Sequence, residues 1–121
     1  MINCRHNFIQ VTSSNATLFT LLGPNVDGVV VFLENTDPLN YISYQFQGSP
    51  TNNDGDYTNL AEGSGNQGVA GVLAPGGRAM VNIRVTNPYI RVQASSSGGA
   101  LLHYTIAQFF PTSANFFTNG V

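Results

Sequence analysis

Apolar and polar residues alternate strictly in the segment 78–85, directly after a turn at Pro75-Gly76-Gly77. The apolar positions of this segment are Ala79, Val81, Ile83 and Val85. Side chains of a β-strand point alternately to its two sides, so residues two apart share a side. The segment therefore predicts a strand with one buried side and one wetter side, and the wetter side carries Arg78 and Arg84.

The same pattern predicts further strands along the chain. Alternating segments occur at 41–47, 89–94 and 100–110, and shorter apolar runs at 7–12, 17–22, 57–61 and 69–73. The run 29–34 is β-branched and apolar on both sides, which is typical of a central strand covered by a second sheet and by a neighbour or loop. Clusters of Gly, Pro and Asn separate these segments, and none shows a helical period.

About seven or eight strands at spacings of about 8–12 residues predict an all-β fold, a single antiparallel β-sandwich. Immunoglobulin-like and jelly-roll topologies both remain open, because strand order is not written in periodicity. The length of 121 residues fits one domain over 1–121, with 1–6 and 111–121 as extended terminal arms. The C-terminal arm, which carries Phe116 and Phe117, either folds back on its own sandwich or docks on a neighbouring subunit.

Charge is scarce in this chain. Charged residues make up 8% and lysine is absent, whereas an average soluble domain has about 25% charged residues. A free monomer usually carries more surface charge, so this composition favours a surface partly covered by other subunits. The net charge of −2 argues against nucleic-acid and anionic-membrane partners. We expect neither a signal peptide nor a membrane span, and a reducing cytoplasm suits the single cysteine, Cys4.

Candidate chemical groups are few. His6 and His103 are the histidines, and neither stands in a pattern that indicates a catalytic triad with Cys4 or a serine. We interpret His103 as a surface or interface residue. The segment 52–56 is similar to the start of a calcium loop but lacks the closing glutamate, and the loop 63–68 lacks the lysine of a P-loop. The sequence thus predicts no enzyme, no metal site and no cofactor.

Between Val30 and Ala94 the chain resembles the small β-sandwich virion proteins of tailed bacteriophages, particularly capsid decoration or cement proteins. The shared pattern is an extended strand ending in Gly48-Ser49, an Asp-Gly loop, the Pro-Gly-Gly turn with its alternating strand, and Tyr-Ile-Arg-Val at 89–92. These features are turns and strands rather than active-site residues, so the resemblance provides no catalytic residues to carry over.

The resemblance implies a non-enzymatic virion protein, assembled in the host cytoplasm, that decorates the outer surface of the capsid. Its implied partner is the major capsid protein, and its implied state is a homotrimer. A tail or fibre component and a carbohydrate-binding module remain alternatives, the last with Tyr41, Tyr57 and Tyr89 as its candidate aromatic row. Buried aromatic residues dominate protein interfaces. The predicted interface residues are Ile2, Arg5, Arg78, Arg84, Phe116 and Phe117.

Overall fold

A computed structural model describes residues 2–22, 27–63, 65–85 and 87–109. These residues form nine strands and one turn of 3₁₀ helix, η1 (Asp54–Asp56). The strands are β1 (Ile2–Val11), β2 (Ala16–Leu22), β3 (Gly28–Asn35), β4 (Ile42–Ser49), β5 (Thr58–Asn59), β6 (Ala70–Leu73), β7 (Arg78–Arg84), β8 (Tyr89–Ser95) and β9 (Ala100–Phe109). The predicted all-β fold class is confirmed, and the nine strands slightly exceed the expected seven or eight.

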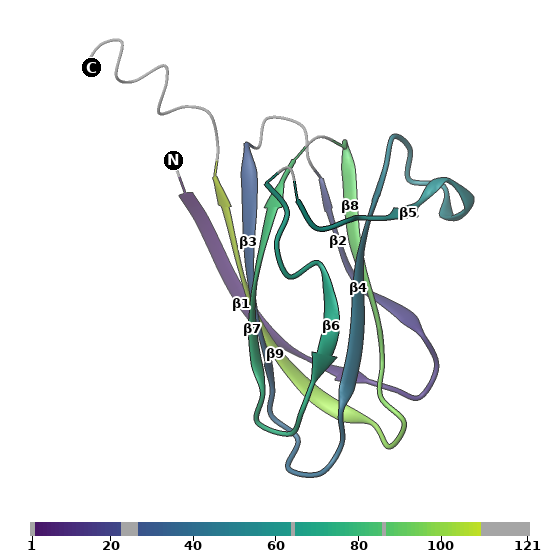
Figure 1. Ribbon diagram of the computed structural model, residues 1–121, viewed down its shortest axis with the longest axis vertical. Coiled ribbons are helices and arrows are strands. Elements are labelled where there is room, and N and C mark those ends of the chain that lie inside the picture. The colour runs from purple at the N-terminus through teal and green to yellow at the C-terminus, as the bar shows by residue number, and fades with distance from the viewer. Residues whose placement is uncertain (1, 23–26, 64, 86, 110–121) are drawn as a thin grey trace.

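The strands form two facing antiparallel sheets (Figure 1). Sheet A has the order β1-β9-β3-β7, and sheet B has the order β2-β8-β4, with β5 and β6 both pairing with β4. Apart from the step from β4 through β5 to β6, every connection carries the chain from one sheet to the other. Sheet A therefore has four strands and sheet B has five. Without the two-residue strand β5, the order is that of two four-stranded sheets linked as a jelly roll, which decides between the two topologies that the sequence left open.

The core lies between the two sheets and follows the predicted alternation. Sheet A contributes Val31 and Val81, both at 0% exposure, which lie directly opposite each other in the β3–β7 pairing. Sheet B contributes Phe46 and Val92, paired in the same way across β4 and β8. Every second residue of β3 and of β8 is buried, because an extended backbone places alternate side chains on the inner face.

The N-terminal segment differs from the prediction. Residues 2–6 are not an arm, because β1 begins at Ile2 and pairs without interruption with β9, from Ile2 opposite Phe109 to Val11 opposite Ala100. The segment contains few apolar residues, so periodicity gave no sign of a strand, and the backbone hydrogen bonds to β9 hold it in place. The predicted C-terminal arm, 111–121, lies outside the described residues.

The Pro75-Gly76-Gly77 turn is tied to the end of β3 by a buried asparagine. Asn35 is 0% exposed. Its backbone N–H donates to the carbonyl of Gly77 at 2.9 Å, and its carbonyl accepts from the N–H of Gly76 at 3.0 Å. Gly76 has φ +74°, a conformation that glycine adopts without the steric cost that a β-carbon brings. The turn therefore fixes β7 beside β3.

Inner and outer residues of β7 should respond differently to truncation. Ile83→Ala removes a side chain that is 3% exposed, and we expect it to lower the free energy of unfolding by about 2–5 kcal/mol. Met80→Ala, on the outward side of the same strand, should change it by less than about 0.5 kcal/mol. Urea unfolding of the two variants measures both values, and similar losses would contradict the assignment of inner and outer faces.

Candidate functional site

The outer face of sheet A carries several apolar residues beside polar and charged ones. Across this face Phe32 of β3 lies opposite Met80 of β7 and Thr105 of β9, while Val30 lies opposite Asn82 and Ala107. The apolar residues of this face, called the outer apolar face below, are Cys4, Phe8, Val30, Phe32, Met80, Leu101, Ala107 and Phe109. Met80 is 60% exposed and Phe8 53% exposed. The described residues therefore leave this face open to solvent.

A charged row crosses the same face at one end. Glu34 of β3 accepts from the Arg78 guanidinium, with Nη2 and Oε2 3.3 Å apart, and its other oxygen lies 3.5 Å from His103 Nδ1. The Phe8 ring lies against the His103 ring, with centroids 4.6 Å apart. This row agrees with the interpretation of His103 as a surface residue, and it places Arg78 at the rim of the outer apolar face.

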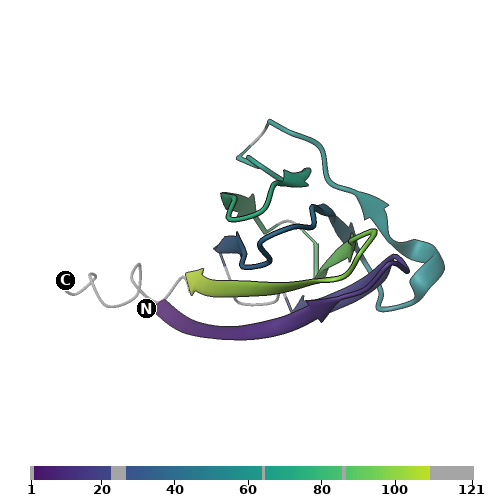
Figure 2. The same cartoon turned by 90° about the horizontal axis from the view of Figure 1, so that it is seen from below.

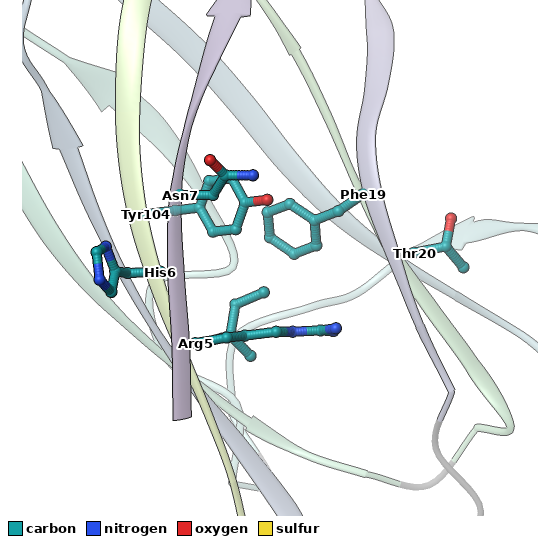
Figure 3. Close-up of a pocket in the computed structure, with 7 residues that line it drawn as sticks. Arg5, His6, Asn7, Phe19, Thr20 and Tyr104 are labelled. Carbon is teal, nitrogen blue, oxygen red and sulfur yellow. The ribbon is translucent and has the colours of Figure 1, made fainter. Parts of the chain in front are cut away.

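A pocket opens between the two sheets where β1 and β2 lie at their edges (Figure 3). Its volume is about 240 Å³. Its apolar wall is formed by Phe19 and Tyr104, whose ring centroids are 4.7 Å apart, together with Ile106. The side chain of Arg5 extends across the pocket toward β2, and Asn7 lies beside Tyr104 (Figure 3). Arg5 is therefore a pocket residue rather than part of a free arm.

Two strand edges flank this pocket. Within the described part of the chain, β1 pairs only with β9 and β2 pairs only with β8. β1 lies along the outside of the sandwich with β9 beside it (Figure 2). An unpaired strand edge presents backbone N–H and C=O groups that can pair with another chain. The strand β1 thus borders the outer apolar face on one side and the pocket on the other.

The outer face of sheet B is polar instead. Arg91 of β8 donates to Gln47 Oε1 at 2.8 Å and pairs with Asp54 at 2.6 Å. Its guanidinium also lies 3.9 Å from the centre of the Tyr57 ring. Across the middle of the sheet Gln45 lies opposite Gln93. This face has the alternation expected of a sandwich, with apolar residues inside and polar residues outside.

The three tyrosines proposed for sugar binding do not form a row. Tyr41 directly precedes β4, whereas Tyr89 lies opposite Ser49 at the other end of that strand. That spacing is roughly 25 Å along an extended backbone. The face of Tyr57 that Arg91 covers is also closed to a stacked ring. The geometry therefore provides no aromatic platform from these residues.

The acidic residues of the loops serve internal contacts. In the segment 52–56, Asp54 pairs with Arg91, and Asp56 accepts from the Thr51 hydroxyl at 2.5 Å. Among the described residues no three His, Cys, Asp or Glu side chains gather as metal ligands would. None of the described helices is long and apolar enough to cross a membrane.

Glu62 closes the glycine-rich loop. Its two oxygens accept from the backbone N–H groups of Gly68 at 3.0 Å and Val69 at 2.9 Å, and these hydrogen bonds lower the pKa of the carboxyl group. Tyr44 holds the same loop from the other side by donating to the Gly68 carbonyl at 2.8 Å. Burial, and secondly the charge of Glu62, raise the pKa of Tyr44. Both ionisable groups therefore anchor the loop.

The Glu62 anchor should weaken in acid. A carboxyl group with a lowered folded-state pKa contributes stability above its unfolded pKa, and this contribution is lost as the pH falls through the folded value. We expect the NMR titration of Glu62 to give a pKa below its ordinary value, and the Gly68 and Val69 amide signals to shift in the same step. Glu62→Gln should abolish that step, and a titration at the ordinary pKa would contradict the anchor.

The structure separates the predicted interface residues. Arg78 and Arg84 point away from the core on β7, and Arg5 lies in the pocket on the inner side of sheet A. Ile2 begins β1, opposite Phe109, and Phe116 and Phe117 lie outside the described residues. Sequence reasoning missed Phe8, Phe32 and Met80 as one surface. The available signal was the run 29–34, which is apolar on both of its sides.

No protein-family model and no curated protein matches this chain. Solved structures are similar in fold. A subunit from "Bacillus endospore appendages form a novel family of disulfide-linked pili" aligns with TM-score 0.55 and 13% identity, over 90% of this chain and 88% of that one. PirA aligns with TM-score 0.54 and 15% identity, over 85% and 92%. The SPBc2 prophage-derived protein YomS aligns with TM-score 0.47 and 9% identity, over 87% and 95%. The first two alignments show a similar fold and, at these identities, nothing further.

Proposed function

We propose that this protein is a non-enzymatic structural subunit that binds other protein subunits through the outer apolar face of sheet A. The observation that carries the proposal is the exposure of Phe8 and Met80 on a face that also holds Phe32 and Val30. Large apolar patches on a soluble protein mark interaction sites. The outer face of sheet B, by contrast, is mostly polar.

The partner we propose is the major capsid protein of a tailed bacteriophage, with this protein decorating the outside of the shell as a homotrimer. The resemblance of the segment 30–94 to capsid decoration proteins supports this role. The low content of charged residues supports it as well, because covered surfaces need few charges. The pilus-forming subunit of similar fold supports the use of such a sandwich in a large assembly. The proposed location is the virion, without nucleic-acid or membrane contacts.

The size of the face favours a repeated contact over a single pair. Four strands about 4.8 Å apart and eight residues rising about 3.3 Å each cover about 500 Å². A stable complex of two proteins usually buries about 800 Å² on each partner. A face of this size therefore gains from symmetry, because a trimer engages a shell through several weak contacts at once.

The proposal predicts that one charge on the outer apolar face disrupts assembly. Met80→Glu introduces a carboxylate at an exposed position, and we expect it to weaken co-sedimentation with shells of the major capsid protein from the same genome by about tenfold or more. Ser43→Glu, on the outer face of sheet B, is the matched control and should bind as the unaltered protein does. Thermal unfolding of both variants verifies that they fold.

Equal binding by two folded variants would contradict the assignment of the outer apolar face. Binding of the unaltered protein to isolated tails and not to shells would instead indicate a tail component. Analytical ultracentrifugation of the free protein tests the homotrimer separately, because a monomer at all concentrations would overturn it.

A further inference from the structure

The pocket between β1 and β2 contains an arginine without an acidic partner among the described residues. Arg78 and Arg91 each pair with a carboxylate, at 3.3 Å and 2.6 Å, whereas Arg5 and the outward-facing Arg84 form no ion pair within the described ranges. Its side chain lines the pocket and extends from β1 toward β2 (Figure 3). A guanidinium presents planar donors that match a carboxylate, so this end of the pocket favours an acidic group.

The other end of the pocket favours an apolar group. Phe19 and Tyr104 form its aromatic wall, and Ile106, at 1% exposure, joins it to the core. The volume of about 240 Å³ is smaller than the sites of about 300–1,000 Å³ that hold free ligands of drug size. A single side chain therefore fits the apolar end better than a larger free ligand does.

The surroundings of the pocket favour an extended chain. A strand that adds to the free edge of β1 would send every second side chain inward, in line with Arg5 and Asn7. Arg5 lies opposite Ile106 and Asn7 lies opposite Tyr104 in the β1–β9 pairing. Of two successive inward side chains of an added strand, one would thus contact the Arg5 guanidinium and the other the wall of Phe19 and Tyr104.

We propose that this pocket receives an extended segment of a partner protein, in which an acidic residue pairs with Arg5 and an apolar residue two positions away packs on Phe19 and Tyr104. This proposal shares one assumption with the proposed function, namely that the carboxylate belongs to a partner protein. It concerns the inner side of β1 and uses none of the outer apolar face, so either can fail alone.

The chemistry of the pocket is tested with a small acid and its neutral analogue. We expect 3-phenylpropionate to shift the NMR signals of the Ile106 methyl groups and the Phe19 ring, and 3-phenylpropanamide to bind about fivefold more weakly, because it lacks the charge that pairs with Arg5. Arg5→Gln should remove this preference, whereas Arg84→Gln, an arginine on the outer side of β7, should leave it intact. Equal binding of acid and amide, or an unchanged preference in Arg5→Gln, would overturn the proposal.

The source of the carboxylate is tested with a blocked pentapeptide of sequence Thr-Glu-Thr-Phe-Thr and its Gln analogue. Strand addition should shift the backbone amide signals of β1 together with the Ile106 signal, and the Gln analogue should do so about fivefold more weakly. Binding of the small acid without any response to the peptide would identify a free carboxylate ligand and overturn the partner segment. Loss of shell binding in Met80→Glu with an unchanged peptide response would separate this site from the outer apolar face.

Discussion

The buried side chain of Asn35 joins parts of the chain that belong to both sheets. Its amide donates to the carbonyls of Asn40 at 2.7 Å and of Leu73 and Ala74 at 3.2 Å, and its oxygen accepts from the N–H of Asp37 at 3.0 Å. A polar group at 0% exposure is costly unless such partners satisfy it. The end of β3, the connection to β4 and the turn between β6 and β7 are therefore held at one point.

This junction matters because it fixes the register of β3 against β7. Residues on a strand alternate between its faces, so a slip of one position would exchange the inner and outer sets. In the observed register Val31 and Val81 face the core, while Phe32 and Met80 face outward. The outer apolar face thus follows from the same contacts that build the core. Which residues lie on the outer apolar face is therefore set by the β3–β7 register, and the hydrogen bonds of Asn35 hold that register.

Local pattern predicted most of this fold and little of its candidate site. The alternation at 78–85 and 89–94 correctly marked Val81, Ile83, Ile90 and Val92 as core, because the period of a strand acts over adjacent residues. The sites depend on strand order instead. Phe8 meets His103, and Arg5 approaches Tyr104, only because the first and last strands pair. The burial of Asn35 has no local signal, because two of the carbonyls that its side chain contacts, those of Leu73 and Ala74, lie far along the chain.

The strand β1 depends for its local stability on pairing with β9, a segment distant in the sequence. From Cys4 to Phe8 its side chains are exposed, so this half of the strand is held mainly by the backbone ladder to β9 rather than by apolar burial. Segments with few buried contacts and a free edge open more readily than core strands. The partner segment proposed above would supply both missing contributions, backbone pairing at the edge and burial of the pocket. Under that proposal, binding at this edge would be coupled to the ordering of β1 itself.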